Sequence, residues 1–122
     1  MAGGAWAHDA RLRLASSAKR LALAAVHLES GSAVRALAEL TRAEAELAGE
    51  LEWLGALARA GADYRALIAH DRLELALEDL AAARRWSVTD GQLAAYHAQL
   101  AIQRVTEAVE ALRETKGGGG DG

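Results

Sequence analysis

The segment Leu40–Leu51, LTRAEAELAGEL, carries the pattern that decides the fold. Around it, leucines recur at steps of three and four residues, which is the spacing of one face of an α-helix. Position 44 holds a glutamate where the same spacing calls for an apolar residue. The segment therefore predicts an amphipathic helix whose apolar row is broken by a carboxylate. That row is Ala33, Leu37, Leu40, Glu44, Leu47, Leu51, Leu54 and Ala58.

Three short breaks divide the chain into four helical segments. Gly31 and Gly61 suit the left-handed residue that ends a helix, and Asp63 suits the N-cap of the next. Thr89 and Gln92 have the spacing of a capping box ahead of the last segment. The predicted helices span about 6–30, 33–60, 63–86 and 90–115. Because connections this short force neighbours to be antiparallel, the sequence predicts an all-α, single-chain, up-down-up-down four-helix bundle over residues 1–116, with a flexible glycine-rich tail at 117–122.

The composition agrees with this fold and excludes several kinds of function. The chain of 122 residues has no proline, 31 alanines and 19 leucines, as expected for a sequence that favours helix throughout. A net charge of −3 with mixed signs gives no basic face for nucleic acid, and the absence of cysteine excludes disulfides and thiolate metal sites. No apolar run is long enough to span a membrane, and the N-terminus lacks a signal peptide, so we expect a cytoplasmic protein.

Two of the other helices have one clear apolar row, and one has two. The first row is Ala10, Leu14, Ser17, Leu21, Ala24 and Leu28. The row of the last helix is Ala94, Ala98, Ala101, Val105, Ala108 and Leu112. The third helix has one face with Ala66, Ala69, Leu73, Ala76 and Leu80, and another with Tyr64, Ile68, Leu75, Ala82 and Trp86. Periodicity alone does not decide which of these two faces points inward.

Glu44 is the centre of the predicted site. Reflecting residue numbers through each turn places it near the height of Lys19, Asp79 and His97. An ionised carboxylate in a dry core costs several kcal/mol unless it is paired, so a partner or a bound molecule is expected. Ser17 and Thr41 lie within a turn of Glu44. Small side chains at the same level, including Ala48, Ala98 and Ala101, either draw the helices together or leave room for a ligand.

Several readings of these polar residues stay open. Glu44 either turns to the edge and pairs with Lys19 or an arginine, or accepts a hydrogen bond from a ligand, or acts as a catalytic base. His97 is a boundary histidine bonded to water or an acid, a contact of Glu44 or the ligand, or a metal or haem ligand. No Glu-x-x-His motif is present, so the di-iron signature of helical bundles is missing.

Weaker candidates complete the predicted site. Asp71 and Arg104 are expected to face each other as an ion pair or to orient a ligand. Tyr64 is either a core residue with its hydroxyl at the rim or a ligand contact. Gly49 and Gly55 each cost about 1 kcal/mol inside a helix, which close approach by a helix or a ligand would explain.

In its apolar rows, its capping residues and its lack of proline and cysteine, the chain resembles de novo designed single-chain four-helix bundles. Within that class it looks like the bundles that hold a drug-like small molecule or a porphyrin. The resemblance is architectural and carries no motif, so no functional residue transfers. An alanine- and arginine-rich surface departs from many designed bundles, so a natural helical protein stays open as the alternative.

These observations lead to one expected function with three alternatives. We expect a monomeric binding protein that holds an amphipathic, largely planar small molecule between its helices, with polar contacts from Glu44 and His97, and with no nucleic-acid or membrane partner. The alternatives are an enzyme with Glu44 as general base, a haem or porphyrin binder, and a purely structural bundle. No cofactor is required by the leading expectation.

Overall fold

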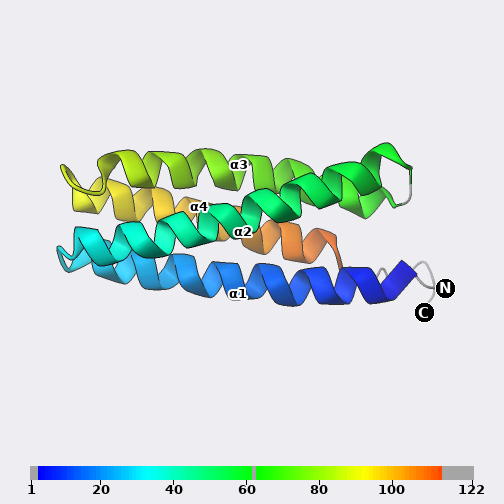
Figure 1. Ribbon diagram of the computed structural model, residues 1–122, viewed down its shortest axis with the longest axis horizontal. Helices are drawn as coiled ribbons and strands as arrows, with labels where there is room; N and C mark the ends of the chain where they lie inside the picture. The colour runs from blue at the N-terminus through cyan, green and yellow to red at the C-terminus, as the bar shows by residue number, and fades with distance from the viewer. Residues whose placement is uncertain (1–2, 62, 114–122) are drawn as a thin grey trace.

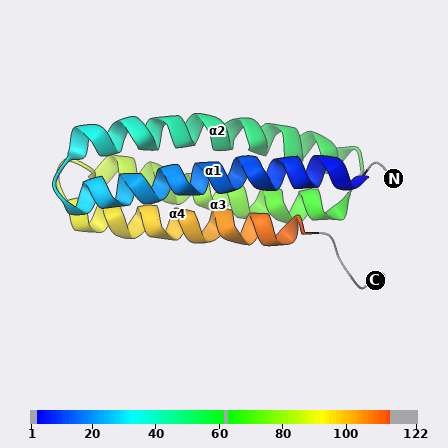
Figure 2. The same cartoon turned by 90° about the horizontal axis from the view of Figure 1, so that it is seen from below.

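The protein is an all-α bundle of four helices, as the sequence predicts (Figure 1). The computed structural model describes residues 3–61 and 63–113. The helices are α1 (Gly3–Glu29), α2 (Ala33–Arg59), α3 (Tyr64–Trp86) and α4 (Gly91–Ala111). Each helix packs against the two that adjoin it in the order α1, α2, α3, α4 and back to α1, so the four surround one core (Figures 1 and 2). The predicted tail at 117–122 lies outside the described residues.

The helix ends follow the predicted signals, with one exception. Gly31 and Gly61 have φ of +84° and +68°, the left-handed conformation expected of them. Asp63 is the N-cap of α3, and its side chain accepts a hydrogen bond from the backbone N–H of Arg65 at 2.9 Å. The predicted capping box at Thr89 is wrong, because the turn continues through that residue. Asp90 caps α4 instead and accepts from the N–H of Leu93 at 3.0 Å.

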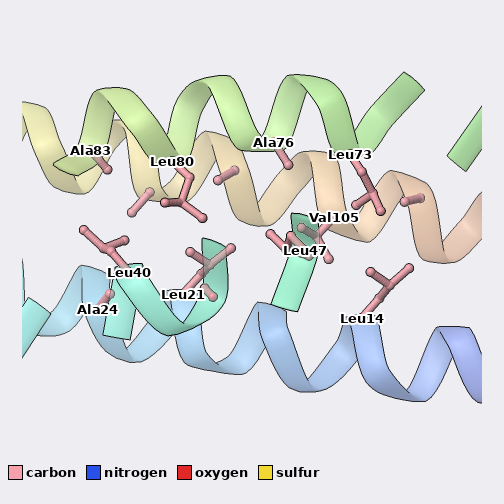
Figure 3. Close-up of a cluster of buried hydrophobic side chains, with 14 of the residues drawn as sticks. Leu14, Leu21, Ala24, Leu40, Leu47, Leu73, Ala76, Leu80, Ala83 and Val105 are labelled. Atoms are coloured by element: carbon pink, nitrogen blue, oxygen red, sulfur yellow. The ribbon is translucent and has the colours of Figure 1, made fainter. Parts of the chain in front are cut away.

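Leucine and alanine side chains from all four helices fill the centre of the bundle. The labelled side chains in Figure 3 point toward one another from α1, α2, α3 and α4. The largest side chains that solvent does not reach are Leu14, Leu21, Leu40, Leu47, Leu54, Leu73, Leu80, Leu112 and Val105. In α3 the buried face is the one that contains Ala69, Leu73 and Leu80, whereas Tyr64 on the other face is 73% exposed. This settles the two-faced pattern of the third helix.

The predicted apolar row of α2 is wrong in five of its eight positions. The buried row contains Ala36, Leu40, Ala43, Leu47 and Leu54. The five other predicted residues are only partly buried and flank that row: Ala33, Leu37, Glu44, Leu51 and Ala58. Periodicity misleads here because alanine, which is small enough to let the helices approach, takes the row position, while leucine covers its side.

Alanines draw α1 and α4 together instead of leaving a cavity. Ala25 of α1 and Ala95 of α4 are both buried, and so are Ala98 and Ala101. At the start of α4, a Cβ built on Gly91 would lie 2.7 Å from the carbonyl oxygen of Leu28 in α1. The helices therefore approach too closely for a ligand to lie between them at this level.

The two glycines inside α2 have different surroundings. A Cβ at Gly55 would lie 3.3 Å from the imidazole of His70 and from the guanidinium of Arg59, so the missing side chain makes room for His70. A Cβ at Gly49 would have nothing within 4 Å, and Gly49 is exposed. Helix packing thus explains Gly55 and does not explain Gly49.

We expect Gly49→Ala to raise the free energy of unfolding by about 1 kcal/mol, because alanine restricts the unfolded chain and meets no neighbour in the folded one. Gly55→Ala should gain clearly less, since His70 and Arg59 must move to admit the methyl group. Urea denaturation of both variants measures the difference. Equal gains at the two positions would contradict this account.

The N-cap of α3 should make stability depend on pH. The Arg65 side chain, helped by its backbone N–H, lowers the pKa of Asp63 below its ordinary value of 3.8, although partial burial opposes the shift. Since the pKa of Asp63 is lower in the folded chain than in the unfolded chain, the ionised carboxylate stabilises the fold. This stabilisation is complete above about pH 4 and is lost as the pH falls through the folded-state pKa. We expect Asp63→Ala to cost about 1 kcal/mol at neutral pH and the cost to shrink on acidification, as followed by urea denaturation. A cost that is independent of pH would contradict it.

Candidate functional site

A polar groove opens between α1 and α2. It has a volume of about 240 Å³ and is lined by Arg13, Ser16, Ser17, Glu46 and Glu50. We call these five residues and the space between them the α1–α2 groove. Two of them, Ser17 and Glu50, occupy places in the buried rows of their helices, so the groove reaches inward from the surface.

Glu50 is the acid that interrupts the apolar row of α2. It follows Leu47 by three residues and precedes Leu54 by four, which is the place of a core residue. Its side chain is only 11% exposed. Arg13 of α1 pairs with both of its oxygens, through Nε to Oε2 and through Nη2 to Oε1 at 3.1 Å. The buried end of this carboxylate therefore depends on a charge supplied by the neighbouring helix.

Ser17 supplies the matching polar position in α1. It lies in the row between Leu14 and Leu21 and is 2% exposed. Its hydroxyl donates a hydrogen bond of 2.8 Å to Oε1 of Glu46. Thus each of the two helices that form the groove replaces one core residue with a hydrogen-bonding side chain.

Ion pairs hold the charged wall of the groove in place. Arg20 donates to Glu39 at 3.0 Å and lies 3.2 Å from Glu46. The hydrogen bond to Glu50 raises the pKa of Arg13, and those to Glu39 and then Glu46 raise the pKa of Arg20. Three carboxylates and two guanidinium groups thus line or border the groove, which leaves one excess negative charge.

Two tryptophans lie beyond the α1–α2 groove, on the other side of Arg13. The guanidinium carbon of Arg13 lies 5.4 Å from the centre of the Trp53 ring. Trp53 in turn meets Trp6 edge to face, with ring centres 5.5 Å apart. Trp53 is 37% exposed, so its ring lies against Arg13 on one side and reaches solvent. Arg13 therefore separates the groove from an aromatic surface.

The structure does not bring Glu44 and His97 together. Glu44 was expected in the interior, but it flanks the row with 36% of its side chain exposed and pairs with Arg84 of α3. His97 lies 3.2 Å from Asp79 of α3. Glu44 thus pairs with an arginine at the edge of the bundle and His97 contacts an acid at the boundary, which is the first of the readings that the sequence analysis held open for each residue.

The other predicted site residues are also scattered. Thr41, Ala48 and Tyr64 are exposed, whereas Ala98 and Ala101 are packed in the core. Only Ser17, among the ten predicted residues, lines the α1–α2 groove.

The expected pairing of Asp71 with Arg104 does not occur. Asp71 is exposed, and its carboxylate lies 3.8 Å from Nδ1 of His70. Arg104 donates to Glu107 at 3.3 Å, and Arg72 of α3 reaches the same carboxylate at 3.6 Å. Arg72, the residue after Asp71, is therefore the neighbour of Arg104 across the shared carboxylate of Glu107.

Sequence reasoning missed four residues that line the groove: Arg13, Ser16, Glu46 and Glu50. A signal for Glu50 was present, since the row of Ala36, Leu40, Ala43 and Leu47 continues through position 50 at steps of three and four. Choosing that row over its neighbour requires knowing which residues face the other helices. Arg13 and Glu46 follow once α1 and α2 are aligned in antiparallel register.

The histidines are arranged for neither haem nor a buried metal ion. His8 is exposed, and His27, His70 and His97 are partly buried outside the apolar rows. In α3, His70, Asp71 and Glu74 offer ligand atoms within 4.8 Å of one another, but both acids are exposed. They could approach a metal ion only at the surface of one helix.

Comparisons of the chain with protein families, with curated proteins and with solved structures found no match. Among the described helices, none combines the length and hydropathy that a membrane span needs.

We expect Glu50→Leu to raise the free energy of unfolding by about 1 kcal/mol, because leucine completes the apolar row of α2. Arg13 loses its carboxylate partner but is half-exposed, so water and Trp53 remain as its neighbours. Glu44→Leu is the matched control, since it removes the more exposed acid and should change stability by less than about 0.5 kcal/mol. Thermal and urea denaturation test both variants. A loss of stability in Glu50→Leu would show that the acid serves the fold.

Proposed function

We propose that the protein binds a small polar molecule in the α1–α2 groove. One observation carries this proposal: Glu50, an acid, occupies a core position beside an open groove and faces Ser17, the polar member of the α1 row. A sequence that is otherwise consistent with its fold breaks a packing rule most often where it has a function.

The chemistry of the groove sets the kind of ligand. Its volume of about 240 Å³ lies below the range of roughly 300–1,000 Å³ that holds a drug-sized molecule. Its lining residues are serine, glutamate and arginine, which present hydroxyl, carboxylate and guanidinium groups beside their aliphatic stems. The proposal therefore takes a smaller and more polar ligand than the planar drug-like molecule or porphyrin that the sequence suggested.

Binding is better supported than catalysis. A general base must reach the proton that it abstracts, and Arg13 contacts both oxygens of Glu50, so a substrate would first have to displace Arg13. Glu46 likewise accepts from Ser17 and Arg20. This arrangement favours a site in which ligand groups replace existing hydrogen bonds.

Two further parts of the proposal concern the chain as a whole. Every residue that lines the groove comes from one chain, which supports a monomer as the binding unit. The seven-residue steps that place Trp6, Arg13 and Arg20 along one side of α1 are regular, and this regularity supports the resemblance to designed ligand-binding bundles.

We expect a thermal-shift screen against small amines, amidines, amides and carboxylic acids to find compounds that raise the melting temperature, because a ligand of the native state stabilises it by RT ln(1 + [L]/Kd). The shift should vanish in Glu50→Gln and shrink in Ser17→Ala. Glu44→Gln is the control and should keep it. The proposal fails if no compound stabilises the chain, or if Glu44→Gln and Glu50→Gln lose the shift equally.

A further inference from the structure

The environment of Arg13 indicates which ligand chemistry the α1–α2 groove accepts. Its side chain is 50% exposed, whereas the Glu50 carboxylate that it contacts is only 11% exposed. The same guanidinium lies over the ring of Trp53. The half-exposed guanidinium of Arg13 thus covers the nearly buried carboxylate of Glu50 and the ring of Trp53. A carboxylate and an aromatic face are the two kinds of partner that a planar cation prefers.

Arg13 can leave this position and remain solvated. Because half of its side chain already lies in solvent, a change of rotamer would carry the guanidinium into water. Glu50 and Glu46 would then line the groove with no cation in contact with Glu50, and Arg20 would stay with Glu39 and Glu46. The opened site would carry more negative charge than the closed one.

The geometry favours a flat, delocalised cation over other ligands. Arg13 contacts Glu50 through two adjacent nitrogens, the paired arrangement that a guanidinium or an amidinium makes with a carboxylate and that an ammonium does not reproduce. An anionic ligand would meet both Glu46 and Glu50. A neutral amide would lack the charge that Glu50 requires once Arg13 has left.

We propose that the α1–α2 groove binds a planar organic cation of the guanidinium or amidinium class, which displaces Arg13 from Glu50 and Trp53. The inference rests on the function proposed above and names the class of its ligand. Arg13 then acts as an internal competitor that occupies the site when no ligand is bound.

Three probes of one shape and different charge test the inference: benzamidine, benzamide and benzoate. Isothermal titration calorimetry should show benzamidine binding to the full chain, and at least tenfold more tightly to Arg13→Ala, which lacks the competitor. Arg13→Met, which keeps an apolar stem beside Trp53, provides a second variant if the alanine form does not fold. Adding Glu50→Gln to either variant should abolish the gain, whereas adding Glu44→Gln should leave it unchanged.

The outcomes separate this inference from the broader function. Benzoate binding that Arg13→Met abolishes would overturn the cation assignment but keep the groove as a binding site. Failure of benzamidine to bind the Arg13 variants would also overturn the cation assignment, while a Glu50-dependent hit of another class in the thermal-shift screen would preserve the proposed function. If Glu50→Gln leaves the tighter benzamidine binding unchanged, the cation assignment is also overturned, because the Glu50 carboxylate would not be the partner of benzamidine.

Discussion

Each helix of the bundle can bury only a narrow row of side chains, and the rest of the structure depends on this constraint. Helices that pack side by side at about 8–10 Å leave room for one row from each, with small residues where they approach most closely. Leucine and alanine fill most of these positions along α1 and α2, and Ser17 and Glu50 take two of them. The α1–α2 groove lies beside these two polar positions.

The fold could be predicted because its signals are local. The three breaks, the glycines at Gly31 and Gly61 and the cap at Asp63 act on their immediate neighbours, and each alone ends or begins a helix. The choice between two adjacent rows in α2 is not local. Steps of three and four residues fit Leu37 and Ala36 equally well, and hydrophobicity ranks the leucine higher. What decides between them is the distance to the next helix, which the sequence of α2 alone does not contain.

The sequence did not locate the α1–α2 groove, which only Ser17 among the predicted site residues lines. The sequence analysis looked for an acid in a buried row near a small polar residue, and the structure has that combination in Glu50 and Ser17. Glu44 was selected because its flanking position was mistaken for the row. His97 was selected by height along the bundle, but height does not say which neighbour a boundary residue faces, and His97 lies 3.2 Å from Asp79 of α3.

Glu44 and Glu50 share one side-chain chemistry and differ in position, and the proposed function rests on that difference. Both are glutamates of α2, and both pair with an arginine of an adjacent helix. Glu44 keeps about a third of its side chain in water, where an ion pair contributes little and displaces nothing. Glu50 holds a core position at the expense of an apolar residue, and its arginine is half in solvent and also covers an indole ring. The proposed function assigns ligand binding to Glu50 instead of Glu44 because Glu50 takes the place of a core residue and because its arginine can reach solvent without leaving the surface of the bundle.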